Sequence, residues 1–325
     1  MKRFLITGGA GFIGSNIARA LLEKKLQVTV LDNFSTGSML NLENVPNERL
    51  LKVIHGDVCD LSVLKDAMEG VDAVFHEAAL VSVPESLANP DLSFSNNAKG
   101  SFNVFEAARQ MGVNKIVYAS SAAVYGEKKQ MPINESFSSE PLSPYALDKT
   151  YLEGLAKVYW SAYGISSVGL RYFNVFGEGQ DPTSPYSGVI SKFVDCCVSG
   201  NAPVIYGDGL QSRDFVYVDD VVDANIRSMN SDHKGAFIYN IGSGVSSSIN
   251  DLFEVIRCLS GFDVECKYAA SRDGEIYTSV ANVDLALKEL GWKAKISLKE
   301  GLQFMLSTMH EKGEALTSKQ GGFSK

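Results

Sequence analysis

Short apolar runs alternate with amphipathic stretches through the first half of the chain. The apolar runs are rich in β-branched residues and lack the strict alternation of a half-exposed strand, so they predict buried strands. These strands are expected at Arg3–Thr7, Val28–Leu31, Leu51–His55, Ala73–His76, Lys115–Ala119 and Ser167–Tyr172. The stretches between them have the 3.6-residue period of helices, as in Phe12–Lys24, Leu61–Glu69 and Phe102–Met111. Strand–helix alternation predicts an α/β fold whose parallel sheet is covered on both faces.

The pattern changes after Tyr172. Proline- and glycine-rich loops appear, and helical patterns follow at Val189–Ser199, Val221–Ser228, Ile249–Leu259, Val283–Leu290 and Leu298–Met309. We interpret residues 1–172 as one domain and residues 173–325 as mainly a smaller second lobe. One apolar run in the second half, Phe237–Ile241, is expected to return to the first sheet.

Composition and charge exclude several classes of function. The 325 residues include 30 Lys and Arg against 38 Asp and Glu, and the net charge of −8 argues against binding to nucleic acid or to an anionic membrane. The five cysteines form no C-x-x-C pair and the four histidines no metal-ligand spacing, so we expect reduced thiols and no metal site. The chain contains no apolar run long enough to span a membrane, and glycines interrupt its apolar start before a signal peptide could form. A cytoplasmic protein is therefore expected.

A glycine-rich turn follows the first predicted strand and opens the first helix. Its sequence is TGGAGFIG at residues 7–14, with G-x-x-G-x-x-G spacing through Gly8, Gly11 and Gly14. Glycine lets the backbone turn tightly and approach a pyrophosphate, whose charge the helix N-terminus stabilises. Such a turn also arises for packing alone. Its place between a strand and a helix favours a dinucleotide site.

Residues at the ends of the next three strands extend this site. Asp32 ends the second predicted strand, where an acid can accept hydrogen bonds from the adenosine ribose. A carboxylate there repels a 2′-phosphate, so NAD is favoured over NADP. Asp57 and Val58 follow the third strand and are expected beside the adenine, and Ala78 and Ala79 follow the fourth and are expected beside the pyrophosphate. An ordinary loop aspartate and plain strand-end packing are the alternatives.

Tyr145 and Lys149 form a Y-x-x-x-K pair. Ser143 and Pro144 precede them as a helix N-cap and first helical residue, and an apolar-periodic stretch follows to Tyr163. Residues four apart share a helix face, so Lys149 is expected beside Tyr145. A nearby ammonium favours the phenolate, which would lower the pKa of the tyrosine towards working pH and make it a usable base.

A serine and a second tyrosine–lysine pair bear on this interpretation. Tyr125 and Lys129 have the same spacing, but a charged loop follows Tyr125, so we interpret their pairing as accidental. Ser121 follows the fifth predicted strand, at the edge where open parallel sheets bind ligands. With Tyr145 and Lys149 on the next helix, it predicts a hydride-transfer site beside a nicotinamide. A turn serine and a surface Tyr/Lys pair are the alternatives.

Together these motifs resemble the extended short-chain dehydrogenase/reductase family, and within it the NAD-dependent nucleotide-sugar epimerases. The resemblance covers the chain to about residue 310 and rests on TGGAGFIG (7–14), LDNFSTG (31–37), HGDV (55–58), HEAA (76–79), YASSAAVYG (118–126), SPYALDK (143–149), LRYFNVFG (170–177), YGDGLQSRDFVYVDD (206–220) and the R-x-G-E at 272–275. It implies a Rossmann-type doubly wound parallel sheet with a smaller C-terminal α/β lobe for a UDP-sugar. It also implies a tightly bound NAD that is regenerated in each turnover. A homodimer is implied through two helices per subunit, here at about 93–111 and 145–163.

The resemblance also implies roles for individual residues. Tyr145 would be the base, Lys149 its electrostatic partner and a ribose ligand, and Ser121 the hydroxyl that orients O4. The implied cofactor contacts are Gly8, Gly11, Phe12, Ile13, Gly14, Asp32, Asn33, Ser35, Gly37, Asp57, Val58, Ala78, Ala79, Tyr145, Lys149 and Phe173. The implied substrate contacts are Ser82, Ser121, Asn174, Gly188, Val189, Tyr206, Gln211, Arg213, Arg272 and Ser279. The two guanidiniums would hold a diphosphate within an acidic chain, and surface salt bridges are the alternative.

A few positions separate the subgroups of this family. Dehydratases of the family carry Asp-Glu after the serine or threonine, whereas Ala122 and Ala123 here supply no acid–base pair, which implies epimerisation at C4. Ser279 stands where some glucose/galactose-restricted epimerases have a bulky tyrosine, and with Gly188 it leaves room for an N-acetyl group. Val81 departs from the glycine of some relatives that prefer N-acetylated sugars. The implied reaction interconverts UDP-GlcNAc and UDP-GalNAc, and as a second pair UDP-Glc and UDP-Gal, through a 4-keto sugar.

Two further hypotheses remain open at the level of sequence. The same C4 oxidation could serve a UDP-uronic acid 4-epimerase, or a decarboxylase or dehydratase of nucleotide sugars. From a different class, the chain could be a non-catalytic NAD-binding regulator that kept the fold and lost the chemistry. The intact Ser121, Tyr145 and Lys149 argue against the regulator.

Overall fold

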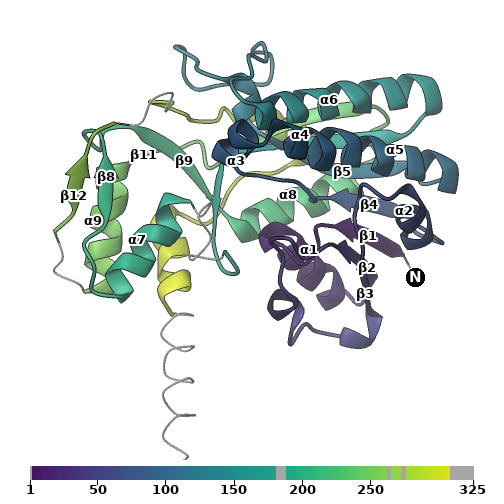
Figure 1. The fold of residues 1–325 in the computed structure, drawn as a ribbon, viewed down its shortest axis with the longest axis horizontal. Coiled ribbons are helices and arrows are strands. Elements are labelled where there is room, and N and C mark those ends of the chain that lie inside the picture. Colours follow the sequence, from purple (N-terminus) through teal and green to yellow (C-terminus); the bar gives the residue numbers. More distant parts are fainter. Residues whose placement is uncertain (1, 181–187, 262–264, 272–275, 308–325) are drawn as a thin grey trace, which may run out of the picture.

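A seven-stranded parallel sheet forms the centre of the molecule. The computed structural model describes residues 2–180, 188–261, 265–271 and 276–307. The strand order is β10-β6-β5-β4-β1-β2-β3, and every pairing in this sheet is parallel (Figure 1). The strands are β1 (Arg3–Thr7), β2 (Gln27–Asp32), β3 (Leu51–His55), β4 (Ala73–His76), β5 (Lys115–Ser121), β6 (Ser166–Tyr172) and β10 (Ala236–Ile241). The run expected to return from the second half therefore lies beside β6.

Helices cover both faces of this sheet, which confirms the predicted α/β fold. On one face lie α1 (Phe12–Glu23), α8 (Val218–Asn230) and α10 (Asp284–Leu290). On the other face lie α2 (Leu61–Ala67), α5 (Gly100–Met111) and α6 (Pro144–Tyr163). Shorter helices connect the main elements: α3 (Val83–Ala88), α4 (Pro90–Ser93), a π-helical segment (Phe94–Lys99) and 3-10 helices at Met39–Leu42, Glu48–Leu50 and Ala122–Tyr125. Each face buries its own apolar cluster against the sheet, so the sheet has a core on both sides.

The third strand differs from its prediction in burial. The sequence indicated a buried strand, but β3 lies at the edge of the sheet and pairs only with β2. Lys52 and His55 are exposed, and Val53 and Ile54 are half-buried. An edge strand has a neighbour on one side only, so its apolar side chains lose less water than those of inner strands. The run of β-branched residues therefore predicted the strand correctly, but it did not predict that the strand lies at the edge of the sheet.

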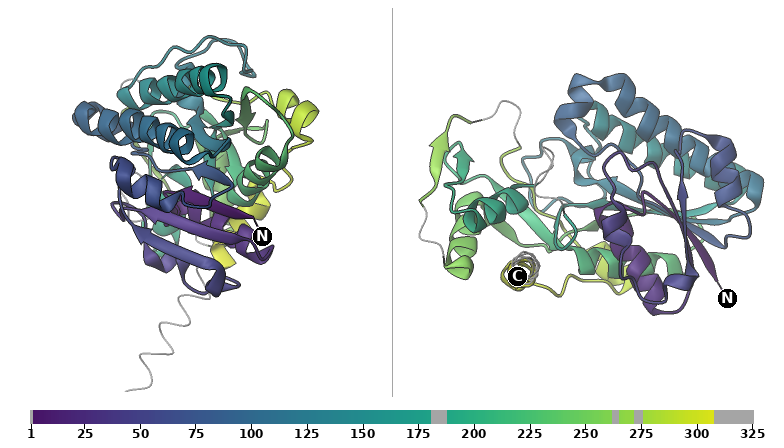
Figure 2. Two further views of the ribbon diagram at one scale, coloured as in Figure 1. Left: turned by 90° about the vertical axis from the view of Figure 1, so that its right-hand side faces the viewer. Right: turned by 60° about the horizontal axis from the view of Figure 1, so that its bottom comes forward.

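The second half of the chain, apart from α8, β10 and α10 at the central sheet, forms a smaller lobe beside the sheet (Figure 2). Its strands are β7 (Asn174–Phe176), β9 (Ser212–Tyr217) and β11 (Ser246–Ser248) in one small sheet, and β8 (Val204–Tyr206) and β12 (Lys267–Ala269) in another. Its helices are α7 (Val189–Val198), α9 (Ile249–Ser260) and a helix at 298–307. An apolar cluster of its own, which includes Phe176, Phe193, Phe253 and Leu302, holds them together. No helix in the described part of the chain is both long and apolar enough to cross a membrane.

A buried ion pair joins α6 to the sheet. Arg171 donates to Glu153 from Nε at 2.8 Å and from Nη2 at 2.6 Å, and both side chains are 5% exposed. The Ser120 hydroxyl donates to the same carboxylate at 2.6 Å, and the guanidinium lies 4.6 Å from the centre of the Tyr125 ring. Bidentate geometry and these extra contacts offset part of the cost of removing two charges from water. The pair thus fixes the position of α6 against β5 and β6.

Candidate active site

The glycine-rich turn between β1 and α1 forms a tight cradle. Gly8 has a φ of +67°, its N–H donates to the Leu31 carbonyl at 2.9 Å, and its carbonyl accepts from Gly11 N at 3.1 Å. A Cβ on Gly8 would lie 2.6 Å from Ala78 N, and a Cβ on Gly14 would collide with the Gly8 carbonyl. The backbone needs glycine at both places because no side chain fits there. Gly11 is the N-cap of α1 without a side-chain cap, so the helix N-terminus is available to an anion.

The residues expected around an adenosine lie together at the ends of β2 and β3. Asp32 is buried, and its carboxylate accepts from Ala10 N at 2.9 Å and from Phe34 N at 2.8 Å. The Asn33 amide donates to Asp57 at 2.9 Å, which links the two strand ends. Three more predicted cofactor residues lie in the same region. Ser35 N donates to Asn33, and a Cβ on Gly37 would lie 3.0 Å from the Asp32 carboxylate. Val58 is buried beside Gly100. Phe12 and Ile13 point into the two apolar clusters that flank α1.

Ser121, Tyr145 and Lys149 come together at the carboxyl edge of the sheet. α6 begins at Ser143, whose hydroxyl accepts from Ala146 N at 3.2 Å, with Pro144 as the first helical residue. The Lys149 ammonium lies 5.8 Å from the centre of the Tyr145 ring and donates to the Ala119 carbonyl at 2.8 Å. Ser121 at the end of β5 is close enough to Tyr145 to influence its ionisation, and the Ser121 hydroxyl itself accepts from Ala123 N at 3.1 Å. The three groups predicted from the sequence thus share one site.

The pKa of Tyr145 corrects an expectation from the sequence. A neighbouring lysine was expected to lower the pKa of Tyr145, but burial raises it, and the influence of the Ser121 hydroxyl opposes this only in part. Burial also lowers the pKa of Lys149 to about 8, against the carboxylates of Glu77, Asp148 and Glu153. For Tyr145, the loss of phenolate hydration outweighs the expected attraction of the Lys149 ammonium, because Lys149 directs its ammonium to a main-chain carbonyl rather than to the phenol.

Three predicted substrate contacts gather around β9 in the small lobe. β7 pairs with β9, which places Asn174 opposite Phe215. Arg213 on β9 donates to the Ser212 carbonyl at 2.9 Å, and Ser279 N donates to the same residue's carbonyl at 3.3 Å. The sheet register therefore holds Asn174, Arg213 and Ser279 in one region. Arg272, with the rest of the R-x-G-E at 272–275, lies outside the described residues.

The other predicted substrate contacts have mainly local partners. Gln211 donates to the Tyr206 carbonyl at 2.6 Å, which closes the glycine-rich turn between β8 and β9. Gly188 and Val189 start α7, and the Ser82 hydroxyl caps α3 by accepting from Glu85 N at 3.1 Å. Phe173, expected at the cofactor, is buried in a small cluster with Val124, Tyr125, Ile133 and Ala281. These contacts give each residue a structural role whether or not it touches a ligand.

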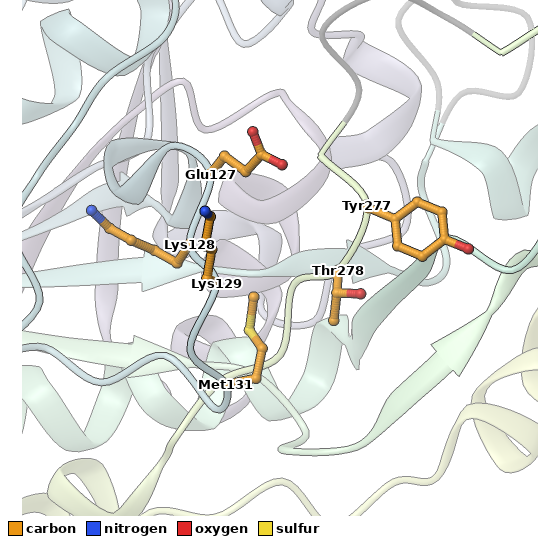
Figure 3. Close-up of a pocket in the computed structure, with 6 residues that line it drawn as sticks. All are labelled: Glu127, Lys128, Lys129, Met131, Tyr277 and Thr278. Carbon is orange, nitrogen blue, oxygen red and sulfur yellow. The ribbon is translucent and has the colours of Figure 1, made fainter.

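A cavity of about 260 Å³ opens between the loop after Tyr125 and Thr278, the residue before Ser279. Glu127, Lys129 and Met131 lie on one side of it and Tyr277 and Thr278 on the other, while the Lys128 side chain extends away from Tyr277 and Thr278 (Figure 3). Its lining side chains are Glu127, Lys128, Lys129, Met131, Tyr277 and Thr278. Lys128 forms an ion pair with Glu140 at 2.6 Å. The second Y-x-x-x-K is separated here: Tyr125 is buried and donates to Asn240 at 2.6 Å, whereas Lys129 lines this open cavity.

Sequence reasoning missed several polar residues around the catalytic group. Asn97, in the π-helical segment, accepts from Leu80 N at 2.7 Å and donates to Asp148 at 3.2 Å. Ser93 donates to Asp148 at 2.6 Å. Glu77 follows β4 and interacts electrostatically with Lys149 and Tyr145. A π-helical turn often marks a functional site, but its presence is not written in a local sequence pattern.

Comparison with known proteins identifies the family. Residues 4–242 match the NAD dependent epimerase/dehydratase family. A solved structure of a UDP-N-acetylglucosamine 4-epimerase from Methanobrevibacter ruminantium M1, in complex with UDP-N-acetylmuramic acid, is 41% identical and has a TM-score of 0.91, covering 96% of this chain and 99% of that one. The UDP-glucose 4-epimerase of Mycolicibacterium smegmatis is 34% identical over 302 residues, 92% of this chain and 96% of that protein. The UDP-glucose 4-epimerase of Thermus thermophilus in complex with NAD is 35% identical, with a TM-score of 0.86, covering 95% of this chain and 99% of that one.

The chain therefore belongs to the NAD-dependent epimerase/dehydratase family. Its fold is the Rossmann-type doubly wound sheet that the resemblance implied, its cofactor is NAD, and as an enzyme it is an isomerase. The cradle at Gly8 and Gly14 and the carboxylate of Asp32 fit a dinucleotide, because they offer close backbone approach and an acceptor for ribose hydroxyls.

Proposed function

We propose that this isomerase is a UDP-sugar 4-epimerase that interconverts UDP-GlcNAc with UDP-GalNAc, and UDP-Glc with UDP-Gal. The observation that carries the proposal is the meeting of Ser121, Tyr145 and Lys149 at the sheet edge next to the glycine cradle. The names of the relatives, which are 4-epimerases of UDP-glucose and UDP-N-acetylglucosamine, support the same reaction. Ala122 and Ala123 follow Ser121, and the chain thus lacks the Asp-Glu pair of the dehydratases at this place.

The proposed chemistry divides between protein and cofactor. When bound next to the glycine cradle and the Ser121–Tyr145–Lys149 group, NAD would supply reversible hydride transfer at C4 of the sugar. Tyr145 removes the proton from O4 and gives it back, Ser121 orients O4 through its hydroxyl, and Lys149 binds the ribose and supplies positive charge. Positioning matters more than acid strength, because one base serves both faces of the sugar. No net oxidation results.

The cofactor and substrate residues follow the two halves of the molecule. We assign NAD contacts to the glycine turn, to the Asp32–Gly37 and Asp57–Val58 segments, and to Ala78 and Ala79, all within residues 1–172. We assign the diphosphate to Asn174, Arg213 and Arg272 in the mainly substrate-binding part, residues 173–325. Guanidiniums suit this task since they pair with phosphates in bidentate geometry. A cytoplasmic location belongs to the same proposal, because its substrate is a nucleotide sugar.

Ser279 is proposed to admit the N-acetyl group. We expect Ser279→Tyr to lower turnover of UDP-GlcNAc by about 10–100-fold while turnover of UDP-Glc changes little, since a bulky ring would fill the space at C2. Product analysis by NMR with both substrates measures this. Tyr277→Phe, an exposed neighbour, is the matched control and should leave the ratio of the two rates unchanged. Equal losses on both substrates in the Ser279 variant would refute the assignment.

A UDP-uronate is the second candidate substrate. Lys128 and Lys129 line a cavity together with Tyr277 and Thr278, and a lysine ammonium there would attract a sugar carboxylate. Glu127 in the same lining and the Lys128–Glu140 ion pair weaken this attraction, so the neutral sugars are favoured. Incubation with UDP-glucuronic acid and NMR analysis of the product separates the two: C4 inversion or loss of CO₂ from the uronate, in preference to the neutral sugars, would support this second candidate.

A homodimer through two helices per subunit completes the proposal. α5 and α6 lie side by side along one face of the molecule (Figure 1). Large apolar side chains on this face are exposed: Leu87, Leu92, Phe94, Phe102 and Met111 before and on α5, and Leu147, Tyr151, Val158 and Tyr163 on α6. Leu147, Tyr151 and Val158 share one side of α6 with Gly154, whose missing side chain would let a second helix approach closely. Exposed apolar side chains gathered on neighbouring helices are typical of a protein–protein interface.

We expect Val158→Arg to convert the dimer into a monomer. Val158 is 59% exposed in the single chain, and a guanidinium at the centre of a helix–helix contact would be buried without a partner. Sedimentation or light scattering at micromolar concentration measures the mass. Leu287→Arg on α10, a 48% exposed leucine outside the patch, is the matched control and should remain dimeric. A wild-type chain that sediments as a monomer would contradict the dimer itself.

A further inference from the structure

Glu77 is an ionisable side chain beside the catalytic group that the mechanism above does not use. It follows β4, where its main-chain N–H donates to the Thr7 carbonyl at 3.1 Å. The next residue, Ala78, is the one that a Cβ on Gly8 would strike. Glu77 therefore stands at the sheet edge between the glycine cradle and the Ser121–Tyr145–Lys149 group.

A chain of hydrogen bonds holds this carboxyl group in place. The Tyr172 hydroxyl donates to Glu77 Oε1 at 3.1 Å, and Asn225 on α8 donates to the Tyr172 hydroxyl at 2.7 Å. Asn225 is itself fixed, because its Nδ2 also donates to the Val221 carbonyl at 2.9 Å. Tyr172 lies opposite Ser121 in the register of β6 and β5. Tyr172 from β6 and Asn225 from α8 thus hold one carboxyl group in place beside the catalytic group.

The charged and titratable groups that face Glu77 come from two elements. α6 contributes Lys149 and Tyr145, and β6 contributes Tyr172, while α8 contributes only the neutral amide of Asn225. His76, the preceding residue, is hydrogen-bonded to Thr7 and to Ser101. Lys149 in turn faces Asp148 and Glu153 besides Glu77.

We propose that Glu77 is a positioning residue whose carboxylate, held by Tyr172 and Asn225, keeps Lys149 charged and sets the pH range in which Tyr145 acts as the base. This inference rests on the proposed epimerase function. Glu77 does not touch the reacting atoms in this account, and it acts through its two ionisable neighbours.

The direction of each effect follows from the sign of the charge. Burial raises the pKa of Glu77 to about 8, although the charge of Lys149 and the hydrogen bond from Tyr172 act to lower it. Burial lowers the pKa of Lys149 to about 8. A carboxylate at Glu77 favours the charged form of Lys149 and so opposes the effect of burial on the ammonium. The same negative charge raises the pKa of Tyr145. Removal of the carboxylate must lower the pKa of both neighbours.

The test compares wild type with Glu77→Gln, both as the NAD-containing protein. We expect both limbs of the pH profile of kcat to move to lower pH by about one unit, because an opposite or like charge at close range shifts a pKa by about that much or more. Glu77→Asp restores the charge and should return the profile most of the way to that of wild type. A profile that only falls in height, with neither limb moved, would overturn the proposal, since a purely structural role predicts that result.

A second readout does not depend on turnover. The ultraviolet phenolate absorbance of Tyr145, taken as the difference between a protein and its Tyr145→Phe counterpart, gives the ionisation midpoint directly. We expect this midpoint to fall in the Glu77→Gln background, and an unmoved midpoint would overturn the inference even if no UDP-sugar is turned over. If Glu77→Gln does not fold, Tyr172→Phe removes only the hydroxyl that holds Glu77 and should move the midpoint in the same direction by less, and no movement would again overturn it.

Discussion

Tyr145→Phe is expected to lower the rate of C4 inversion by a factor of about 10²–10⁴, the usual contribution of a positioned general base. The ring of Tyr145 is only 8% exposed, and phenylalanine keeps its packing while removing the one oxygen that can take the O4 proton. The loss should appear in kcat, measured by NMR detection of the epimer. Bound NAD and the unfolding temperature should stay close to wild type, because the hydroxyl contributes to neither the glycine cradle nor the core.

The chain supplies a matched control for this variant. Tyr125 has the same spacing to a lysine, but its hydroxyl is buried against Asn240 at 2.6 Å. Tyr125→Phe leaves the buried Asn240 oxygen without this donor and should therefore cost about 1–3 kcal/mol of stability while turnover stays nearly unchanged. Near-normal turnover by the Tyr145→Phe enzyme would contradict the assignment of Tyr145 as the base.

The second large effect is on stability. We expect Arg171→Met to lower the free energy of unfolding by about 3–5 kcal/mol, because it leaves the Glu153 carboxylate buried without its partner. Both side chains of the pair are 5% exposed, and two hydrogen bonds of 2.6 and 2.8 Å join them. Urea-induced unfolding, followed by circular dichroism, measures the change.

A surface pair provides the comparison for this variant. Arg257 and Glu254 on α9 form an ion pair of 2.7 Å, with side chains 39% and 58% exposed. Arg257→Met should change the urea midpoint little, since water and salt already screen this pair. Equal losses in the two variants would show that the buried pair has no special role in fixing α6.

The parallel sheet could be predicted from the sequence because local patterns of apolar residues mark its strands. The strands at Arg3–Thr7, Leu51–His55 and Ala73–His76 begin and end where the sequence placed them, since each is a compact run of β-branched and apolar residues between turn signals. The edge position of β3 was not predictable, because the number of neighbours of a strand is a property of the whole sheet. The strands β7, β8, β11 and β12 have only three residues each, too few to show a period.

In the candidate site, too, local patterns were predictable from the sequence and contacts between distant segments were not. Ser121, Tyr145 and Lys149 were found because a strand end, a capping serine and a helical spacing are all local signals. The pKa of Tyr145 was predicted with the wrong sign, because burial depends on distant segments that pack over the ring. Glu77 was missed for a similar reason: its partner Tyr172 is 95 residues away in the chain, and no pattern connects the two.

The most direct test of the central claim is an NMR assay of the purified protein with UDP-GlcNAc and no added cofactor. We expect UDP-GalNAc to appear until the two epimers reach equilibrium, with no net change in the redox state of the bound NAD. The same assay with UDP-Glc should yield UDP-Gal. A protein that carries NAD yet inverts C4 of none of the UDP-sugars tested would contradict the claim and would instead support a non-catalytic NAD-binding protein.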